Sequence, residues 1–332
     1  MQPDDPVPSA IALVGLARNP IPSGPVVGTF PGFDGRPLRF ARWDATRTPK
    51  RGTMCVFAGR TEFIEKYFEV VADLQRRGFA VAMMDWRGQG GSARPLANDK
   101  RKGHVRDFTE YDRDLGCFMR EVVLPDCPPP FHALGHSMGA HILIRNSTAT
   151  GSWFDRMILI APMLELHKES VGLPNWVARS AAELATTLGA GRFYVPGGSR
   201  SAGESDAFAG NNLTSDKERW LRAQMLVKAE PSLGLGSPTY RWLRAAYRSM
   251  AKLADPLFAA RVKVPMLIFV AGGDTIVEPG AIEAFATRLK LGTHVILPTA
   301  RHEILQEDDE IRTRFWAAFD AYLGIARQAT AA

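Results

Sequence analysis

Short apolar runs, many of them rich in β-branched residues, alternate with longer segments of helical periodicity along most of this chain. The runs expected to form buried strands are residues 53–57, 79–84, 131–134, 157–160, 266–270 and 294–297. The segments expected to form helices are residues 63–77, 109–123, 138–148, 281–289 and 309–323. Residues 26–29 and 38–43 are expected to pair as an antiparallel hairpin at one sheet edge. This pattern predicts an α/β fold, a doubly wound sandwich with a mostly parallel sheet between two layers of helices.

One long stretch departs from the alternation. From about Met163 to Leu253 helical patterning continues without a convincing strand. We therefore expect a core in two parts, residues 1–162 and 256–332, with a helical subdomain inserted at residues 163–255. Its place in the chain would set it above the carboxyl ends of the strands, where open α/β sheets bind ligands and where a lid would lie.

The composition is that of an ordinary globular protein, because 45% of the 332 residues are hydrophobic and 23% are charged. The longest apolar stretch near the start, residues 10–16, is too short to span a bilayer and has no basic residue before it, so no signal peptide is expected. Three cysteines without Cys-x-x-Cys spacing indicate neither a disulfide framework nor a zinc site. The net charge of +6 is not concentrated in one run, which disfavours a nucleic-acid partner. We expect a cytoplasmic protein without a bound metal.

The pentapeptide Gly135-His136-Ser137-Met138-Gly139 stands between a predicted strand and a predicted helix. Gly-x-Ser-x-Gly in this context is typical of the nucleophile turn of α/β-hydrolases, and the alternative is a structural turn bounded by glycines. Glycine is needed on both sides because larger side chains would collide with neighbouring elements in so tight a turn. The turn would expose the serine hydroxyl near the free N–H groups at the start of the helix.

A serine hydroxyl needs a base to remove its proton, and in this fold the base follows the nucleophile and the acid in the chain. Three histidines follow Ser137: His167 in the insertion, His294 in a predicted strand, and His302 just beyond that strand. His302 precedes the final predicted helix on a loop from which its side chain could reach the nucleophile. We therefore predict that His302 is the general base.

A carboxylate must fix the orientation and tautomer of that histidine. Asp274 follows the predicted strand at 266–270 through a tight loop with two glycines, and we predict that it has this role. Glu278 is the runner-up. It lies beside Pro279 at the start of the next predicted helix, where capping that helix is the plainer explanation.

A tetrahedral intermediate needs two hydrogen-bond donors for its oxyanion. The first should be the backbone N–H of Met138, which follows the nucleophile. The second should come from the loop after the strand at 53–57, and we choose the N–H of Arg60. Because a backbone group would do this work, the role does not constrain the side chain at position 60.

Taken together, these motifs resemble the lysophospholipase and monoacylglycerol lipase family, also grouped as serine aminopeptidase-like hydrolases. Residues 85–92, Asp-Trp-Arg-Gly-Gln-Gly-Gly-Ser, are similar to that family's Asp-x-Arg-Gly-x-Gly-x-Ser segment. Residues 212–216 and 235–240 resemble the bacterial lysophospholipase L2 branch. The resemblance covers roughly residues 25–325 and implies a serine esterase of the α/β-hydrolase fold that needs no cofactor.

The chain departs from that family at the oxyanion loop, where Ala58-Gly59 stands in place of the usual His-Gly. The glycine that permits the turn remains, and the missing imidazole would not remove the backbone donor. Residues 85–92 themselves have two interpretations, a glycine-rich loop that cradles phosphate or a structural turn beneath the active-site loops. The segment lacks the glycine patterns of nucleotide-binding loops, which favours the structural turn.

Residues 240–253 predict an amphipathic helix in the insertion. One side is apolar and consists of Trp242, Ala246, Tyr247, Met250 and Leu253. A neighbouring basic stripe consists of Arg241, Arg244, Arg248 and Lys252. Such a helix can rest on an anionic membrane surface, meet a phosphate-bearing substrate, or pack on the core with its charges solvated. Trp176, Trp220 and Phe193 offer further apolar surface, either for an acyl chain or for the core.

The leading hypothesis is hydrolysis of the carboxylic ester of a single-acyl lipid, a lysophospholipid or a monoacylglycerol, through an acyl-enzyme intermediate. One alternative is a broad carboxylesterase or amidase that uses the same three residues. Another is a non-catalytic binding module of the same fold, which would usually show a broken triad. The expected partners are an acyl-lipid substrate and, through the lid, the inner membrane surface.

Overall fold

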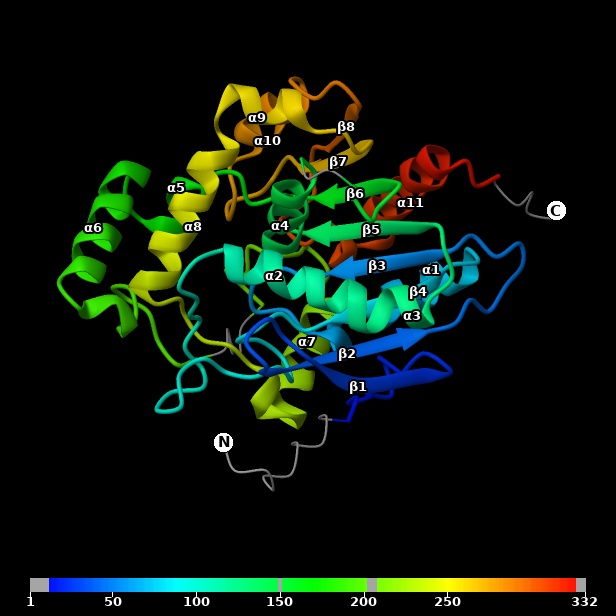
Figure 1. Ribbon diagram of the computed structural model, residues 1–332, viewed down its shortest axis with the longest axis horizontal. Helices are drawn as coiled ribbons and strands as arrows, with labels where there is room; N and C mark the ends of the chain where they lie inside the picture. The colour runs from blue at the N-terminus through cyan, green and yellow to red at the C-terminus, as the bar shows by residue number, and fades with distance from the viewer. Residues whose placement is uncertain (1–11, 149–150, 202–207, 327–332) are drawn as a thin grey trace.

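An eight-stranded sheet forms the centre of the computed structural model, which describes residues 12–148, 151–201 and 208–326 (Figure 1). The strands are β1 (Pro25–Pro31), β2 (Pro37–Trp43), β3 (Thr53–Phe57), β4 (Ala80–Met84), β5 (Phe131–His136), β6 (Arg156–Ile160), β7 (Met266–Ala271) and β8 (Gly292–Leu297). Their order is β1-β2-β4-β3-β5-β6-β7-β8, in which β2 pairs antiparallel with β1 and with β4 and the other pairs are parallel. The predicted mostly parallel sheet and the hairpin at its edge are therefore confirmed.

The middle strands run through the hydrophobic core. Every residue of β3, β4 and β7 is buried, as a continuous apolar run predicts for a parallel strand covered on both faces. The prediction that residues 294–297 form a buried strand is wrong in one respect, because β8 lies at the edge of the sheet and only Leu297 in it is buried. An edge strand has a neighbour on one side alone, so more of its surface stays in contact with solvent.

Helices cover both faces of the sheet. They are α1 (Phe68–Arg76), α2 (Thr109–Phe118), α3 (Leu124–Asp126), α4 (Met138–Asn146), α10 (Pro279–Ala286) and α11 (Asp309–Leu323). Shorter helical turns are η1 (Ile64–Tyr67), the π-helical η2 (Met119–Val123) and η5 (Ile304–Gln306). In Figure 1, α2 and α4 lie in front of the sheet while α1 and α11 lie behind it. The predicted helices at 63–77 and 109–123 are thus each divided, the first by a 3-10 turn and the second by a π-helical turn.

The chain between β6 and β7 is helical. Its elements are α5 (Lys168–Val171), α6 (Asn175–Thr187), η3 (Ala190–Arg192), α7 (Lys217–Ala229), η4 (Pro231–Leu233), α8 (Tyr240–Leu253) and α9 (Pro256–Arg261). Residues 163–201 and 208–253 contain no strand, and Figure 1 shows α6 and α8 beyond the carboxyl ends of β5 and β6. The predicted helical insertion is present where a lid would lie. Its boundaries at residues 163 and 255 stay predictions, and residues 1–11, 202–207 and 327–332 of the expected domains lie outside the described residues.

Candidate active site

Ser137 occupies a strained turn between β5 and α4. Its φ of +50° and ψ of −111° lie where residues with a side chain are rarely found. A Cβ atom on Gly135 would lie 2.9 Å from the backbone N and Cα of Ala140, and one on Gly139 would lie 2.3 Å from the carbonyl oxygen of Phe57. Both positions therefore exclude any side chain, which is the steric reason expected for the two glycines of the motif.

The structure brings the three predicted triad residues together. His302 Nε2 lies 3.0 Å from Ser137 Oγ, and His302 Nδ1 lies 2.6 Å from Asp274 Oδ2. All three residues are buried. Because a carboxylate only accepts hydrogen bonds, Nδ1 carries the proton and Nε2 is free to accept the proton of the serine. The arrangement has the geometry that nucleophilic activation of Ser137 requires.

Asp274 is held in its ionised form. Its Oδ1 accepts hydrogen bonds from the backbone N–H groups of Ile276 at 2.7 Å and Val277 at 3.1 Å. Burial alone would raise the pKa of Asp274, but attraction to His302 and these hydrogen bonds outweigh it and lower the pKa below its ordinary value. One carboxylate oxygen is thus fixed by the loop and the other is left to orient His302.

The other candidates from the sequence lie elsewhere. The Glu278 side chain is 42% exposed, and its ionic partner is His167 at 3.8 Å. Glu278 occupies the N-cap position of α10, but its side chain makes no capping hydrogen bond, so the predicted capping interaction is wrong. His294 lies in β8. Neither His167 nor His294 hydrogen-bonds to Ser137 in the described part of the chain.

The two predicted oxyanion donors have no competing acceptor in the described part of the chain. Within the described residues, no hydrogen bond is made by the backbone N–H of Met138, which opens α4, or by that of Arg60. The side chain of Gln89 fixes the loop on both sides of Arg60, because its Nε2 donates to the carbonyl of Gly59 at 2.9 Å and its Oε1 accepts from the N–H of Thr61 at 3.1 Å. The Arg60 N–H between these bonds is left free for a ligand.

Residues 85–92 hydrogen-bond to the oxyanion loop that follows β3 and to the start of η1. The indole Nε1 of Trp86 donates to the carbonyl of Ala58 at 2.9 Å, so the loop is anchored without the imidazole that the family usually has at position 58. The carboxylate of Asp85 accepts from the N–H of Ile64, at the start of η1, at 3.0 Å. These contacts bear out the interpretation of residues 85–92 as a structural turn, and they identify Gln89 as a supporting residue that the sequence argument did not single out.

His136, the second residue of the nucleophile turn, hydrogen-bonds to Glu62 and to His302. Its Nδ1 lies 2.9 Å from Glu62 Oε2, and its Nε2 lies 3.1 Å from the carbonyl oxygen of His302. Both oxygens can only accept, so both ring nitrogens donate and His136 is an imidazolium ion. Burial would lower the pKa of His136, but the Glu62 carboxylate outweighs it and raises the pKa above its ordinary value. A cation therefore holds the backbone of the predicted general base.

The charge of that cation is balanced by a buried network. Lys66 Nζ lies 3.0 Å from Glu62 Oε1 and 2.5 Å from Glu303 Oε1, which gives two carboxylates and, with His136, two cations. Buried charges are stable only when paired in this way. Glu62, Lys66 and Glu303 were not predicted from the sequence. The available signal was that Glu62 and Lys66 directly follow the oxyanion loop and that Glu303 directly follows His302.

A second set of contacts braces the loop that carries His302. Glu307 is fully buried, and its carboxylate accepts from the N–H of Arg301 at 2.7 Å and from the N–H of Ser215 at 2.7 Å. Thr214 Oγ1 donates to the carbonyl of Gln306 at 2.6 Å. Residues 212–216, which precede α7 and resemble the lysophospholipase L2 branch, thus stabilise the loop that carries the predicted general base.

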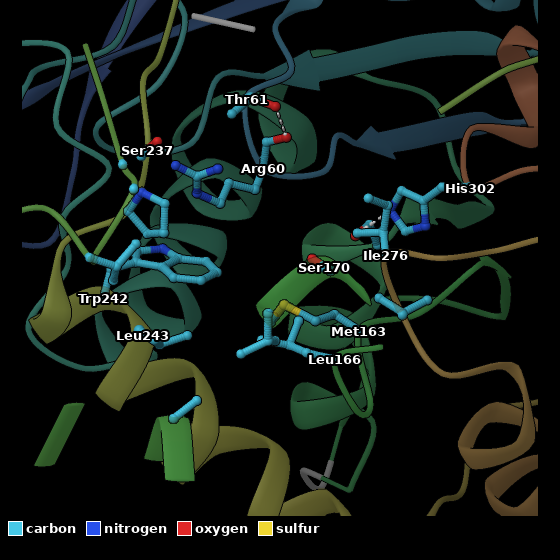
Figure 2. A pocket seen from close by; sticks show the side chains of 18 of the residues that line it. Arg60, Thr61, Met163, Leu166, Ser170, Ser237, Trp242, Leu243, Ile276 and His302 are labelled. Atoms are coloured by element: carbon cyan, nitrogen blue, oxygen red, sulfur yellow. Dashed lines mark hydrogen bonds between the residues drawn. The ribbon is translucent and has the colours of Figure 1, made fainter. Parts of the chain in front are cut away.

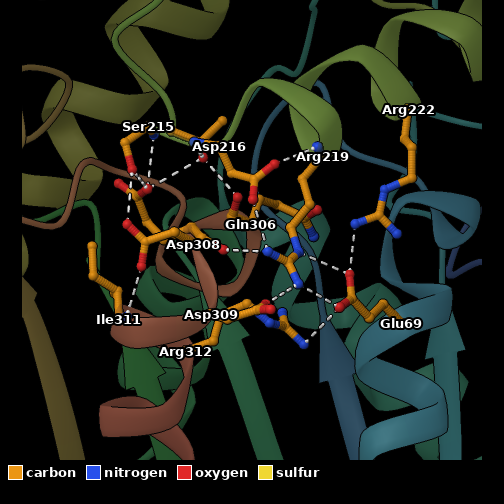
Figure 3. Close-up of polar contacts among 12 residues, drawn as sticks. Glu69, Ser215, Asp216, Arg219, Arg222, Gln306, Asp308, Asp309, Ile311 and Arg312 are labelled. Carbon is orange, nitrogen blue, oxygen red and sulfur yellow. Dashed lines mark hydrogen bonds and ion pairs between the residues drawn. The ribbon is translucent and has the colours of Figure 1, made fainter.

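Helix α7 itself is fixed to the core by ion pairs (Figure 3). Arg219 Nη2 lies 2.7 Å from Glu69 of α1 and 2.6 Å from Asp309 of α11. Arg222 and Arg312 also contact Glu69, at 2.7 and 3.4 Å. Burial would raise the pKa of Glu69, but the surrounding arginines lower it to about 2. Helix α7 is therefore fixed to the core by ion pairs, whereas α6 and α8 lie over the cavity.

A cavity of about 510 Å³ opens above Ser137 and His302 (Figure 2). Its apolar lining comes mainly from the insertion and from the loop after Asp274, and includes Met163, Leu166, Val171, Leu173, Leu243, Ile276 and Val277. Such a volume and lining are typical of a small-molecule site with a few fixed polar groups. The polar groups include the side chains of Ser137, His302 and Arg60.

The three aromatic residues suggested for an acyl chain do not line this cavity. Trp176 and Phe193 are 73% and 65% exposed. Trp220 is buried and stacks edge-on against Phe208, with 5.7 Å between ring centroids. The core alternative therefore holds for Trp220, whereas Trp176 and Phe193 face the solvent. An apolar residue in an insertion can face the core, the cavity or the solvent, and helical periodicity does not distinguish these three.

The described residues contain no group of three or more His, Cys, Asp or Glu side chains placed to hold a metal ion. Among the same residues, no helix combines the length and the apolar character needed to cross a membrane.

Comparison with known proteins gives consistent results along nearly the whole chain. The family model described as serine aminopeptidase, S33 matches residues 48–309. Lysophospholipase L2 of Escherichia coli strain K12 is 30% identical over 304 residues, covering 86% of this chain and 83% of the relative. Monoglyceride lipase of Rattus norvegicus is 29% identical over 278 residues, covering 82% of this chain and 86% of the relative.

Solved structures show the same fold. A soluble variant of monoglyceride lipase from Saccharomyces cerevisiae superposes with a TM-score of 0.72 at 21% identity, covering 91% of this chain and 97% of that one. A carboxyl esterase from Bacillus coagulans superposes with a TM-score of 0.72 at 18% identity, covering 91% and 99%. The predicted α/β-hydrolase fold is confirmed, and the chain belongs to the serine aminopeptidase S33 family of hydrolases.

Proposed function

We propose that the protein hydrolyses the carboxylic ester of a single-acyl lipid, a lysophospholipid or a monoacylglycerol. The observation that carries the proposal is the hydrogen-bonded chain Ser137–His302–Asp274 at the floor of an apolar cavity. The names of two relatives, lysophospholipase L2 and monoglyceride lipase, support the same substrate class. An apolar cavity suits an acyl chain, because burying that chain removes its surface from water.

In the proposed acylation step, Ser137 Oγ attacks the ester carbonyl carbon while His302 Nε2 takes the hydroxyl proton. The oxyanion that forms is stabilised by the N–H groups of Arg60 and Met138, each contributing about 3 kcal/mol. The C–O bond to the alcohol then breaks, His302 returns the proton to the leaving oxygen, and the acyl group stays on Ser137 as an ester. Asp274 remains ionised throughout and stabilises the imidazolium.

Deacylation repeats these steps with water. His302 takes a proton from a water molecule as its oxygen attacks the acyl carbon, and the second tetrahedral intermediate uses the same two N–H donors. Its collapse releases the fatty acid and returns the proton to Ser137 Oγ. No other reactant is needed, so the reaction is balanced by one water for each ester.

A chain-length series tests the substrate class. For monoacylglycerols and lysophosphatidylcholines below their critical micelle concentrations, we expect kcat/KM to rise roughly 3- to 4-fold for each added methylene until the cavity is filled, because each buried methylene contributes about 0.8 kcal/mol. The measurement is the initial rate of fatty-acid release, with Ser137→Ala protein as background. A flat dependence on length, or activity only on a short nitrophenyl ester or anilide, would leave a general esterase or amidase instead.

We also propose that the protein meets the lipid surface through α6 and the residues that flank it. The sequence left open whether the basic stripe of residues 240–253 meets a membrane surface or belongs to a helix packed on the core. Arg244 and Arg248 of that stripe pair with Glu183 of α6 at 2.7 and 2.6 Å. The large apolar side chains that face solvent around α6 are Leu173, Trp176, Leu184, Leu188 and Phe193. Two of them, Trp176 and Leu188, are 73% and 75% exposed. An exposed apolar surface of this kind beside a cavity is typical of an interaction site.

Replacing Trp176 and Leu188 together by serine is expected to lower partitioning onto vesicles by roughly 30- to 150-fold, because each inserted side chain contributes about 1 to 1.5 kcal/mol. Cosedimentation with vesicles containing an anionic lipid measures this. The matched control is Leu257→Ser on α9, which removes a leucine that is 67% exposed. Equal binding by the double variant and the control would show that the surface around α6 does not contact lipid.

A further inference from the structure

The side chain of Arg60 reaches into the cavity and has no ionic partner among the described residues. Its Nη2 donates to the carbonyl of Gly236, and its Cζ lies 5.3 Å from the centroid of the Trp242 ring. Figure 2 shows the guanidinium beside Trp242 and Ser237, across the cavity from His302. In the described part of the chain no carboxylate lies within ion-pair distance of Arg60, and its buried Nε has no acceptor.

A partly buried guanidinium without a counterion among the described residues is unusual, because buried charges are costly unless they are paired. Burial lowers the pKa of Arg60 to about 10, so the group is still charged at neutral pH. The neutral hydrogen bond to Gly236 and the face of the Trp242 ring compensate part of the cost. They also hold the guanidinium in one place, which prepares it to bind an anion.

The other charges that line the cavity are already neutralised. Glu62 and Glu303 are paired with Lys66, and Glu62 also binds the imidazolium of His136. These carboxylates therefore do not oppose an anion at Arg60.

The backbone N–H and the guanidinium of Arg60 would contact different parts of the same substrate. Its backbone N–H is one of the proposed oxyanion donors, so the ester carbonyl would lie at the beginning of the side chain and the guanidinium at its far end. In a 1-acyl glycerophosphate, the glycerol carbons separate the ester oxygen from the phosphorus by a distance similar to the length of an arginine side chain. Guanidinium groups bind phosphate oxygens with two directed hydrogen bonds.

We infer that the guanidinium of Arg60 binds the headgroup phosphate of a lysophospholipid, so that the protein prefers lysophospholipids to monoacylglycerols. The inference rests on the proposed function. It assigns phosphate binding to the side chain of Arg60, for which the sequence indicated a role of the backbone N–H alone. The proposed function includes both lysophospholipids and monoacylglycerols, and the inference selects lysophospholipids.

The first experiment compares kcat/KM for palmitoyl lysophosphatidate, palmitoyl lysophosphatidylcholine and monopalmitoylglycerol, each below its critical micelle concentration. For Arg60→Met we expect the ratio of either phospholipid to the glyceride to fall by roughly 10- to 100-fold, since hydrogen bonds to charged groups are worth that factor. Arg60→Lys should restore part of the ratio. The control is Arg192→Met, which removes an exposed arginine that does not line the cavity and should leave the ratio within about 2-fold. An equal fall for all three substrates would overturn the inference.

The second experiment does not depend on hydrolysis. Calorimetric titration of Ser137→Ala protein with sn-glycerol 3-phosphate should show binding that weakens by at least roughly 10-fold when Arg60→Met is added. Glycerol itself should not bind measurably. If Ser137→Ala and the double variant bind glycerol 3-phosphate equally, or if inorganic phosphate binds as tightly as glycerol 3-phosphate, Arg60 is not a headgroup site. A protein that binds glycerol 3-phosphate through Arg60 but hydrolyses no lipid would contradict the proposed function alone.

Discussion

Replacing Ser137 by alanine is expected to lower kcat for ester hydrolysis by roughly 10⁶-fold. The change removes the oxygen that lies 3.0 Å from His302 Nε2 and leaves that imidazole without a group to activate. A water molecule in its place would have to attack without the entropic advantage of a tethered nucleophile. The remaining activity would come from the two proposed oxyanion donors, the N–H groups of Arg60 and Met138, and from substrate binding.

The alanine variant should fold normally, which makes its loss of activity interpretable. Ser137 has a φ of +50°, and alanine keeps the Cβ atom that makes this conformation costly, so the strain of the turn is unchanged. The measurements are kcat and labelling by a fluorophosphonate, with thermal unfolding to verify the fold. Ser170→Ala, which removes another hydroxyl lining the cavity, is the matched control and should change kcat by less than roughly 3-fold. Residual labelling and turnover in Ser137→Ala would assign the nucleophile to another residue.

Much of the fold could be predicted because the relevant forces act locally in sequence. The buried strands are continuous apolar runs, and Thr53–Phe57 has the observed bounds of β3, with Gly52 before it and Gly59 two residues after it. The exposed edge at β8 could not be predicted, since which strand ends a sheet depends on pairing between distant segments. Which side of α6 faces the solvent could not be predicted for a similar reason. Periodicity shows that a helix has an apolar side, and the tertiary structure decides whether that side meets core or solvent.

Some residues of the candidate site could likewise be predicted from the sequence, and others could not. Ser137, His302 and Asp274 could be chosen because each stands at a position relative to strands and helices that the chemistry dictates. The network of Lys66, Glu62 and Glu303 could not, because its pairs join residues up to 237 positions apart in the chain. A charge that is buried by a distant segment looks, in the sequence, like a charge on an exposed helix. The side chain of Arg60 was passed over because the role assigned to its residue required only the backbone.

Replacing Asp274 by asparagine is expected to lower kcat by roughly 10⁴-fold with little change in structure. The carboxamide oxygen can still accept from the N–H groups of Ile276 and Val277, which bind Asp274 Oδ1 at 2.7 and 3.1 Å. That choice places the NH₂ group where Asp274 Oδ2 stood, 2.6 Å from His302 Nδ1. Two donors cannot face each other, so His302 must carry its proton on Nε2 instead of Nδ1.

A His302 with its proton on Nε2 donates to Ser137 Oγ and cannot accept the serine proton, so the nucleophile is present but inactive. The matched control is Glu278→Gln, which changes the neighbouring carboxylate that the sequence left as an alternative and that is 42% exposed. We expect that variant to keep kcat within roughly 3-fold of the original protein. Equal losses in the two variants would mean that charge near the site matters and tautomer does not. A larger loss for Glu278→Gln would transfer the orienting role to Glu278, against the 2.6 Å contact that now assigns it to Asp274.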